Sequence, residues 1–228
     1  MDKLSFSFFD RDALLVAKEL LGKIIRHCCQ GIWLSAMIIE TEAYYKKEKG
    51  SHASLGFTEK RKALFMEPGT IYMYYARGGD SLNFSCQGEG NAVLIKSCLV
   101  YCDEHTSSEM LPLMQKLNPQ KNMNRPRPIH YLCSGQTLLC KSLGLKVTDW
   151  DQKYFDPERF FLEDIGYRPE KIIQTTRLGI PQGRDEHLMY RFIDYDKAAY
   201  CTSNPLRKKK WTEGKDYHIF ILSQKGTI

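Results

Sequence analysis

Two glutamates that follow an apolar run are the first residues in this sequence whose types suggest chemistry. Glu40 and Glu42 lie in the segment IIETEAY, which Tyr44 completes. Residues two apart in a β-strand point to the same side of a sheet, so these three side chains would share a face. A carboxylate beside an aromatic ring fits general-base catalysis on a stacked substrate. A solvated polar face at the end of a strand is the simpler interpretation.

A second group of residues is aromatic. The segment PGTIYMYY brings Tyr72, Tyr74 and Tyr75 close together in the sequence. Alternate tyrosines in a strand can pack into a core, but they can also form a stacking platform, where each base–aromatic stack contributes about 1–3 kcal/mol. Asn83 adds an amide of the kind that reads base edges. His52 lies in a Gly-Ser-His loop, where a lone histidine is commonly only exposed.

The cysteines and histidines do not form a metal-binding pattern. No CxxC pair occurs among the eight cysteines, and Cys98 and Cys102 have no matching pair downstream at zinc-finger spacing. The zinc-deaminase signature, HxE followed by PCxxC, is also absent. We therefore expect no metal and no other cofactor. We expect the cysteines to be small buried residues rather than disulfide partners.

Composition and charge restrict the class of protein. The 228 residues suit one large domain, and we treat 1–228 as a single domain whose segment 207–228 is a basic C-terminal tail. A net charge of +6 permits a polyanionic partner without requiring one. No apolar run approaches the roughly 18 residues of a membrane span, and the first residues show no targeting signal. We therefore expect no membrane association and a cytoplasmic location.

The elements that must position these residues alternate between helix and strand. Apolar spacing predicts a helix from Ala13 that Gly22 ends, with Asp10 or Asp12 as its N-cap. The glycine pair Gly78-Gly79 predicts the turn of a hairpin. The absence of a βαβ rhythm and of GxGxxG favours an α+β fold over a Rossmann sheet. The other expected elements are strands over 23–28, 33–40, 70–75, 82–86 and 92–100, helices over 109–117 and 138–143, and loops over 46–62 and 181–187.

Taken together, these motifs resemble those of the alkyladenine, or 3-methyladenine, DNA glycosylases. The resemblance is strongest in ETEAY at 40–44, in MEPGTIYMY at 66–74 and across 83–96, and it continues weakly to about Pro205. It implies an α+β single domain with a curved antiparallel β-sheet core surrounded by helices. It also implies a protruding β-hairpin that inserts into the DNA minor groove, and a monofunctional N-glycosyl hydrolase that needs no metal.

The resemblance assigns a role to most of the residues already singled out. Glu42 matches the general base that activates the attacking water. Tyr44, His52 and Tyr74 match the side chains that enclose a flipped base, and Asn83 matches the amide beside position 2 of the purine.

The sequence departs from the family pattern at several positions near the expected DNA. The hairpin tip is one residue shorter, so either Tyr75 or Arg77 would take the place of the usual wedge tyrosine. Lys96 stands where the family has an arginine near the attacking water, which keeps the charge but loses the bidentate fork. The usual GPGKL reads GQTLL at 135–139, so a lysine expected near DNA is missing.

The sequence therefore predicts a base-excision repair enzyme that flips alkylated or deaminated purines, of the 3-methyladenine and hypoxanthine type, out of duplex DNA. Hydrolysis of the N-glycosidic bond would leave an abasic site. The expected partner is double-stranded DNA that contains damaged purines, and the expected state is a monomer, located with the nucleoid in a bacterium or in the nucleus of a eukaryote. Two alternatives stay open: a catalytically inactive nucleic-acid-binding module, and a hydrolase of free purine nucleosides.

Overall fold

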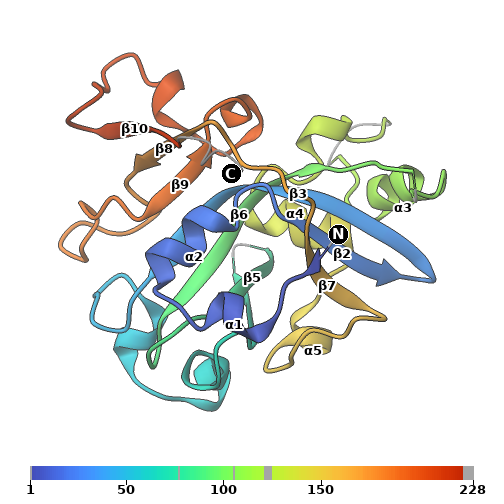
Figure 1. Cartoon of the computed structure of the whole chain (residues 1–228), viewed down its shortest axis with the longest axis horizontal. Coiled ribbons are helices and arrows are strands. Elements are labelled where there is room, and N and C mark those ends of the chain that lie inside the picture. The colour runs from blue at the N-terminus through green and yellow to red at the C-terminus, as the bar shows by residue number, and fades with distance from the viewer. Residues whose placement is uncertain (1, 77, 105, 121–124, 223–228) are drawn as a thin grey trace, which may run out of the picture.

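An open antiparallel β-sheet is the centre of the computed structural model, which describes residues 2–76, 78–104, 106–120 and 125–222 (Figure 1). Within these residues the sheet has ten strands in the order β1-β7-β2-β3-β6-β5-β4, with β9 beside β3, then β8 and β10. The strands are β1 (Asp2–Lys3), β2 (Ile24–Cys29), β3 (Ile32–Tyr44), β4 (Ile71–Ala76), β5 (Gly79–Ser85), β6 (Ala92–Val100), β7 (Phe160–Asp164), β8 (Lys171–Thr175), β9 (Arg191–Asp194) and β10 (Tyr217–Ile221).

Helices pack against this sheet, which confirms the predicted α+β class. Helix α2 crosses β3 and β6, while α4 packs against β5 and β6 (Figure 1). The α-helices are α1 (Phe6–Phe9), α2 (Ala13–Glu19), α3 (Met110–Leu117), α4 (Gln136–Leu143) and α5 (Val147–Trp150), and the 3-10 helices are η1 (His52–Leu55), η2 (Glu59–Phe65), η3 (Ile129–Tyr131), η4 (Ala198–Tyr200) and η5 (Pro205–Arg207). In the described part of the chain, no helix is long and apolar enough to cross a membrane.

Strand β3 carries Glu40, Glu42 and Tyr44 and is longer than the strand predicted over 33–40. It pairs with β2 through its first half, with β6 through most of its length and with β9 at Glu40, Thr41 and Glu42. Its register against β6 shifts on both sides of Glu40, as at a β-bulge. Since a bulge re-aims side chains, Glu40 and Glu42 need not face the same surroundings despite their spacing.

The hairpin of β4 and β5 differs from the prediction at its turn. Ala76 pairs with Gly79, so Gly79 belongs to β5 rather than to the turn. Gly79 lies against α4, where a Cβ on this glycine would come within 2.7 Å of the Thr137 Cβ. The hairpin end is therefore packed on the β5 side, while Tyr75 on β4 is 69% exposed.

Other local predictions have mixed outcomes. Asp12 caps α2 by accepting hydrogen bonds from the Leu14 and Leu15 N–H groups, and Gly22 has the expected positive φ of 87°. The prediction of a loop over 46–62 was wrong in part, because this segment contains η1 and the start of η2. The cysteines are all free; five are buried, Cys28 and Cys29 are half-buried, and Cys102 is exposed, contrary to expectation.

Candidate active site

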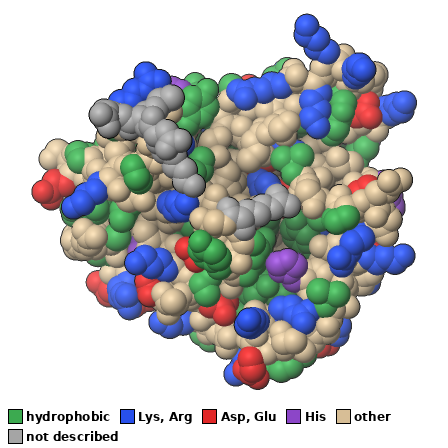
Figure 2. Space-filling view, turned by 180° about the vertical axis from the view of Figure 1, so that it is seen from behind, with side chains coloured by type: hydrophobic (Ala, Val, Ile, Leu, Met, Phe, Trp, Pro, Cys, Tyr) green, Lys and Arg blue, Asp and Glu red, His purple; other side chains and the backbone are tan. Residues whose placement is uncertain are grey.

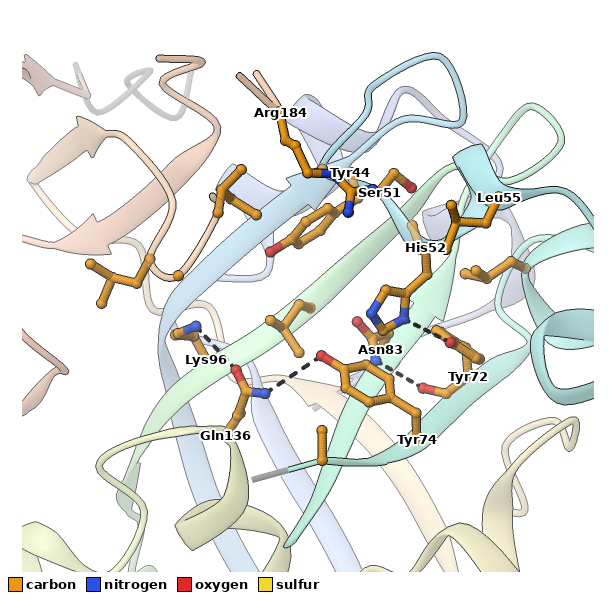
Figure 3. Close-up of a pocket in the computed structure, with 18 of the residues that line it drawn as sticks. Tyr44, Ser51, His52, Leu55, Tyr72, Tyr74, Asn83, Lys96, Gln136 and Arg184 are labelled. Atoms are coloured by element: carbon orange, nitrogen blue, oxygen red, sulfur yellow. Dashed lines mark hydrogen bonds between the residues drawn. The ribbon is translucent and has the colours of Figure 1, made fainter. Parts of the chain in front are cut away.

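A pocket of about 360 Å³ brings together residues that lie far apart in the sequence (Figure 3). Its walls come from β3, η1, β4, β5, β6, the first turn of α4 and the loop 178–184. The residues with predicted roles that line it are Tyr44, His52, Tyr74, Asn83 and Lys96. Across the residues with described positions, no group of three His, Cys, Asp or Glu side chains is arranged to hold a metal ion.

Aromatic side chains lie on two sides of the pocket. Tyr44 is on one side, and His52 and Tyr74 are on the other (Figure 3). The His52 and Tyr74 rings meet edge to face, with centroids 4.6 Å apart and an interplanar angle of 65°. The His52 Nδ1 atom is 3.0 Å from the Tyr72 hydroxyl, which fixes the imidazole orientation. The pKa of His52 is lowered by partial desolvation and by Arg61 and Arg184, so its ring is neutral near pH 7.

Arg177 supports the Tyr44 side of the pocket from behind. Its guanidinium lies 4.5 Å from the centre of the Tyr44 ring, a cation–π contact. One nitrogen, Nη1, donates to the Ala43 carbonyl at 2.9 Å and is 2.5 Å from the Glu48 carboxylate. Arg177 is buried, so this contact limits the movement of Tyr44 away from the pocket.

Glu42 lies directly behind the pocket wall and is fully buried. Its Oε2 atom accepts a hydrogen bond of 2.8 Å from the Tyr44 hydroxyl, and its Oε1 atom accepts one of 3.1 Å from the Leu178 N–H. The Lys96 Nζ atom is 3.4 Å from the same Oε1. Tyr44, Lys96 and Leu178 all line the pocket, so the carboxylate is one side chain away from its interior.

The surroundings of Glu42 keep its carboxylate ionised. Burial acts most strongly and raises the pKa, but the charges of Lys96 and Arg191 and the hydrogen bonds from Tyr44 and Leu178 lower it. The net effect holds the pKa of Glu42 below its ordinary value. Burial and the neighbouring carboxylate raise the pKa of Tyr44, so this hydroxyl stays protonated and donates. An ionised carboxylate beside a binding pocket has the protonation state that a general base requires.

Glu40, two residues before Glu42, is held by hydrogen bonds from side chains outside the pocket. Its carboxylate accepts hydrogen bonds from Arg191 Nε at 2.6 Å, Ser97 Oγ at 2.5 Å and Thr202 Oγ1 at 2.7 Å. It does not line the pocket. Arg191, which pairs with Glu42 between β9 and β3, bonds to Glu40, so both glutamates neighbour the same arginine, but of the two only Glu42 contacts side chains that line the pocket.

Two further pocket residues, Asn83 and Gln136, make hydrogen bonds that the spacing of motifs does not reveal. Asn83 is 5% exposed and donates from Nδ2 to the Tyr72 carbonyl across the hairpin, at 3.1 Å. Gln136 accepts from Lys96 Nζ at 3.0 Å (Figure 3). Sequence reasoning singled out neither Gln136 nor Arg177 for a role in the pocket. Arg77, the other candidate wedge residue, lies outside the described residues.

The fold and the pocket define an α+β protein with an aromatic slot in front of a buried carboxylate. A family model described as methylpurine-DNA glycosylase matches residues 7–198. The chain is 63% identical over 213 residues to a protein of Pseudomonas aeruginosa strain LESB58, which covers 93% of this chain and 88% of that protein.

Two other relatives give the same result. Identity is 63% over 210 residues with a protein of Pseudomonas syringae pv. tomato, covering 92% of this chain and 93% of that protein. It is 29% over 204 residues with one of Clostridium botulinum, covering 86% and 97%. The names of all three assign them, provisionally, as 3-methyladenine DNA glycosylases. The chain belongs to the methylpurine-DNA glycosylase family, which confirms the resemblance seen in its motifs.

Proposed function

We propose that the protein is a monofunctional DNA glycosylase of base-excision repair, with 3-methyladenine and hypoxanthine as the type of base it removes. It flips the damaged purine out of the duplex, hydrolyses the N-glycosidic bond and leaves an abasic site. The observation that carries this proposal is the ionised Glu42 directly behind an aromatic slot. Membership of the family and the names of the relatives support it.

The aromatic slot suits a flipped purine. Its volume, about 360 Å³, is in the range of small-molecule sites. A base between Tyr44 and the pair of His52 and Tyr74 would stack on electron-rich ring faces. A purine methylated at N3 carries positive charge, so cation–π attraction to these rings favours it over the undamaged base. Asn83 lines the same pocket, and in the proposed complex its amide would face the edge of the bound base.

Glu42 supplies the chemistry of the hydrolytic step. Its carboxylate takes the proton of the water that attacks C1′, and its charge stabilises the oxocarbenium-like sugar of the transition state. The Tyr44 hydroxyl and the Leu178 N–H hold one oxygen each, which fixes the plane of the carboxylate. Lys96 borders the same space and adds a positive charge near the nucleophile.

The surroundings of the pocket fit a polyanionic duplex. The chain carries a net charge of +6, and Lys and Arg side chains are spread over the face seen in Figure 2. Arg184 lines the pocket, and Arg61 donates to the His52 carbonyl at its mouth. Tyr75, largely exposed next to the hairpin end, is available as the wedge that fills the gap left by the flipped nucleotide.

The whole proposed site comes from one chain, so we propose that a monomer is active. Because the relatives are bacterial proteins, we also propose that it acts in the cytoplasm, on the DNA of the nucleoid.

The test is incubation of the protein with duplexes that each contain one modified purine, followed by alkaline cleavage at any abasic site. Release of 3-methyladenine or hypoxanthine from the duplex, with no hydrolysis of the free nucleosides, is the expected result. Tight binding to lesion duplexes without base release would instead indicate an inactive binding module. Equal or faster hydrolysis of free nucleosides would indicate a nucleoside hydrolase.

A further inference from the structure

Gln136 is a pocket residue with an unusual set of polar contacts. It is the first residue of α4, and its side chain lies between Lys96 and Tyr74 (Figure 3). The Oε1 atom accepts a 3.0 Å hydrogen bond from Lys96 Nζ. The Nε2 atom donates to Ser81 Oγ at 2.8 Å and lies 3.5 Å from the Tyr74 hydroxyl. One amide therefore joins β4, β5 and β6 at the wall of the pocket.

These contacts decide between two roles for the amide. A residue that reads a base needs a free donor or acceptor that points into the pocket. The Nε2 atom donates to Ser81, which is fully buried, and lies at the longer distance of 3.5 Å from the Tyr74 hydroxyl. The oxygen is committed to Lys96. An amide bound on both ends holds its neighbours in place and has little left to offer a base edge.

Lys96 is the neighbour that needs such a restraint. A lysine carries its charge on a flexible stem and lacks the planar fork with which an arginine fixes its own geometry. The contacts shown for Nζ are the ion pair with Glu42 at 3.4 Å and the hydrogen bond with Gln136 at 3.0 Å. The ion pair is long for a hydrogen bond, so the shorter contact to Gln136 determines where the ammonium lies.

We propose that Gln136 is a positioning residue for base excision: anchored on Ser81, it holds the Lys96 ammonium near Glu42. This inference rests on the proposed function, because it assigns Gln136 a part in the chemistry of Glu42. It acts through Lys96 and does not touch the reacting atoms.

Loss of the amide would have a defined electrostatic consequence. Without its partner, the Lys96 ammonium turns toward the solvent of the pocket, and its attraction to Glu42 weakens. The other groups that face Glu42 stay in place: Arg191 from β9, the Tyr44 hydroxyl from β3 and the Leu178 N–H from the loop after β8. Weaker attraction from Lys96 raises the pKa of Glu42. As the pH falls, the Glu42 carboxylate is therefore protonated, and lost as a general base, at a higher pH than in the wild type.

The experiment compares Gln136→Met with Gln115→Met. Methionine keeps the length of glutamine and cannot form its hydrogen bonds. Gln115 on α3 is a matched control, because it is also half-buried and donates one hydrogen bond, of 3.0 Å, to the Arg127 carbonyl. The readouts are the single-turnover excision rate between about pH 4 and 8, the affinity for a lesion duplex, and the thermal unfolding midpoint.

Gln136→Met is expected to slow excision at neutral pH by about ten- to a hundredfold, the usual effect of a lost hydrogen bond to a charged group. Lesion affinity should stay within about threefold, and the acidic limb of the rate profile should move to higher pH. Gln115→Met should change none of these. If the methionine variant does not fold, Gln136→Asn, which is too short to span both partners, is expected to show the same pattern.

A wild-type rate and pH profile in the folded variant would overturn the inference. So would a loss of rate that is matched by a loss of affinity with an unmoved acidic limb, since that result identifies a residue that binds the base. Failure of the wild-type protein to release any base would instead refute the proposed function, and the two failures are therefore distinguishable.

Discussion

Replacement of Glu42 by glutamine is the most direct test of the proposed chemistry. The amide keeps the shape of the side chain, and its oxygen can still accept from the Leu178 N–H. Its NH₂ group would face the Tyr44 hydroxyl, which can turn from donor to acceptor by rotation about its C–O bond. The change therefore removes the charge and the basicity while it preserves the walls of the pocket.

The size of the effect follows from what the carboxylate does. General-base catalysis typically contributes a factor of about 10²–10⁴, which is about 2.7–5.5 kcal/mol of the activation free energy. In the proposed mechanism the Glu42 charge also stabilises the developing sugar cation, so the loss should lie toward the upper end of this range. Lesion affinity should stay within about tenfold, because Tyr44, His52 and Tyr74 are untouched.

The assay is single-turnover release of the base from a lesion duplex, with the affinity of the same duplex measured by titration. Glu163→Gln is the matched control, because it also removes a carboxylate from an ion pair with little exposure, the 2.9 Å pair with Arg26, far from the pocket. A folded Glu42→Gln protein that retains excision within about tenfold of wild type would refute the assignment of the general base.

The remaining predictions concern selectivity, stability and DNA affinity. Asn83→Ser should raise excision of mispaired guanine relative to hypoxanthine by about tenfold or more, since a clash or an unpaired amino group costs about 1–3 kcal/mol; if both rates fall together, Asn83 only holds the hairpin through its bond to Tyr72. Burial lowers the pKa of His27, whose ring nitrogens contact Leu143 O and Trp150 Nε1. As the pH falls, this imidazole is therefore protonated in the unfolded chain at a higher pH than in the folded chain. The free energy of unfolding should therefore fall as the pH drops below 6.5, and denaturant titrations should show a smaller fall for His27→Phe than for the wild type. Equal falls would show that His27 is not the source of this pH dependence. Affinity for duplex DNA should fall steeply between low and physiological salt, and a flat titration would contradict binding through phosphates.

The sequence predicts those parts of the fold that have strong local signals. An N-cap aspartate at Asp12, the apolar spacing after Ala13 and the glycine at Gly22 located α2, and apolar segments located β2, β6 and much of β3. The hairpin was found from its aromatic strands, although Gly79 was assigned to the turn. Glycine is needed at position 79 because Thr137 on α4 approaches too closely for a side chain. In the sequence alone, a glycine required by such long-range packing cannot be told from one required by a turn.

The part of the sheet after residue 159 could not be predicted as well. Strands β7, β8 and β9 are four or five residues each, too short for a periodic pattern, and they become strands by pairing with distant partners such as β2 and β3. The same limit applies to the pocket. Arg177 reaches Tyr44, and the Leu178 N–H reaches Glu42, only after β8 has docked on β9.

Lys96 shows how contacts decide a question that residue type leaves open. A lysine near the reacting carbon could act as an amine nucleophile and form a Schiff base, which an arginine cannot do. That role requires an unprotonated nitrogen with its lone pair free. In this pocket Nζ lies 3.4 Å from the ionised Glu42 and donates to Gln136, a carbonyl acceptor with no proton to give back. Both partners are acceptors, so both direct the N–H bonds of Nζ toward themselves. The same two contacts therefore place a positive charge beside the proposed general base and occupy N–H bonds of the amine that a Schiff base would need as its nucleophile, in agreement with the proposed attack by water.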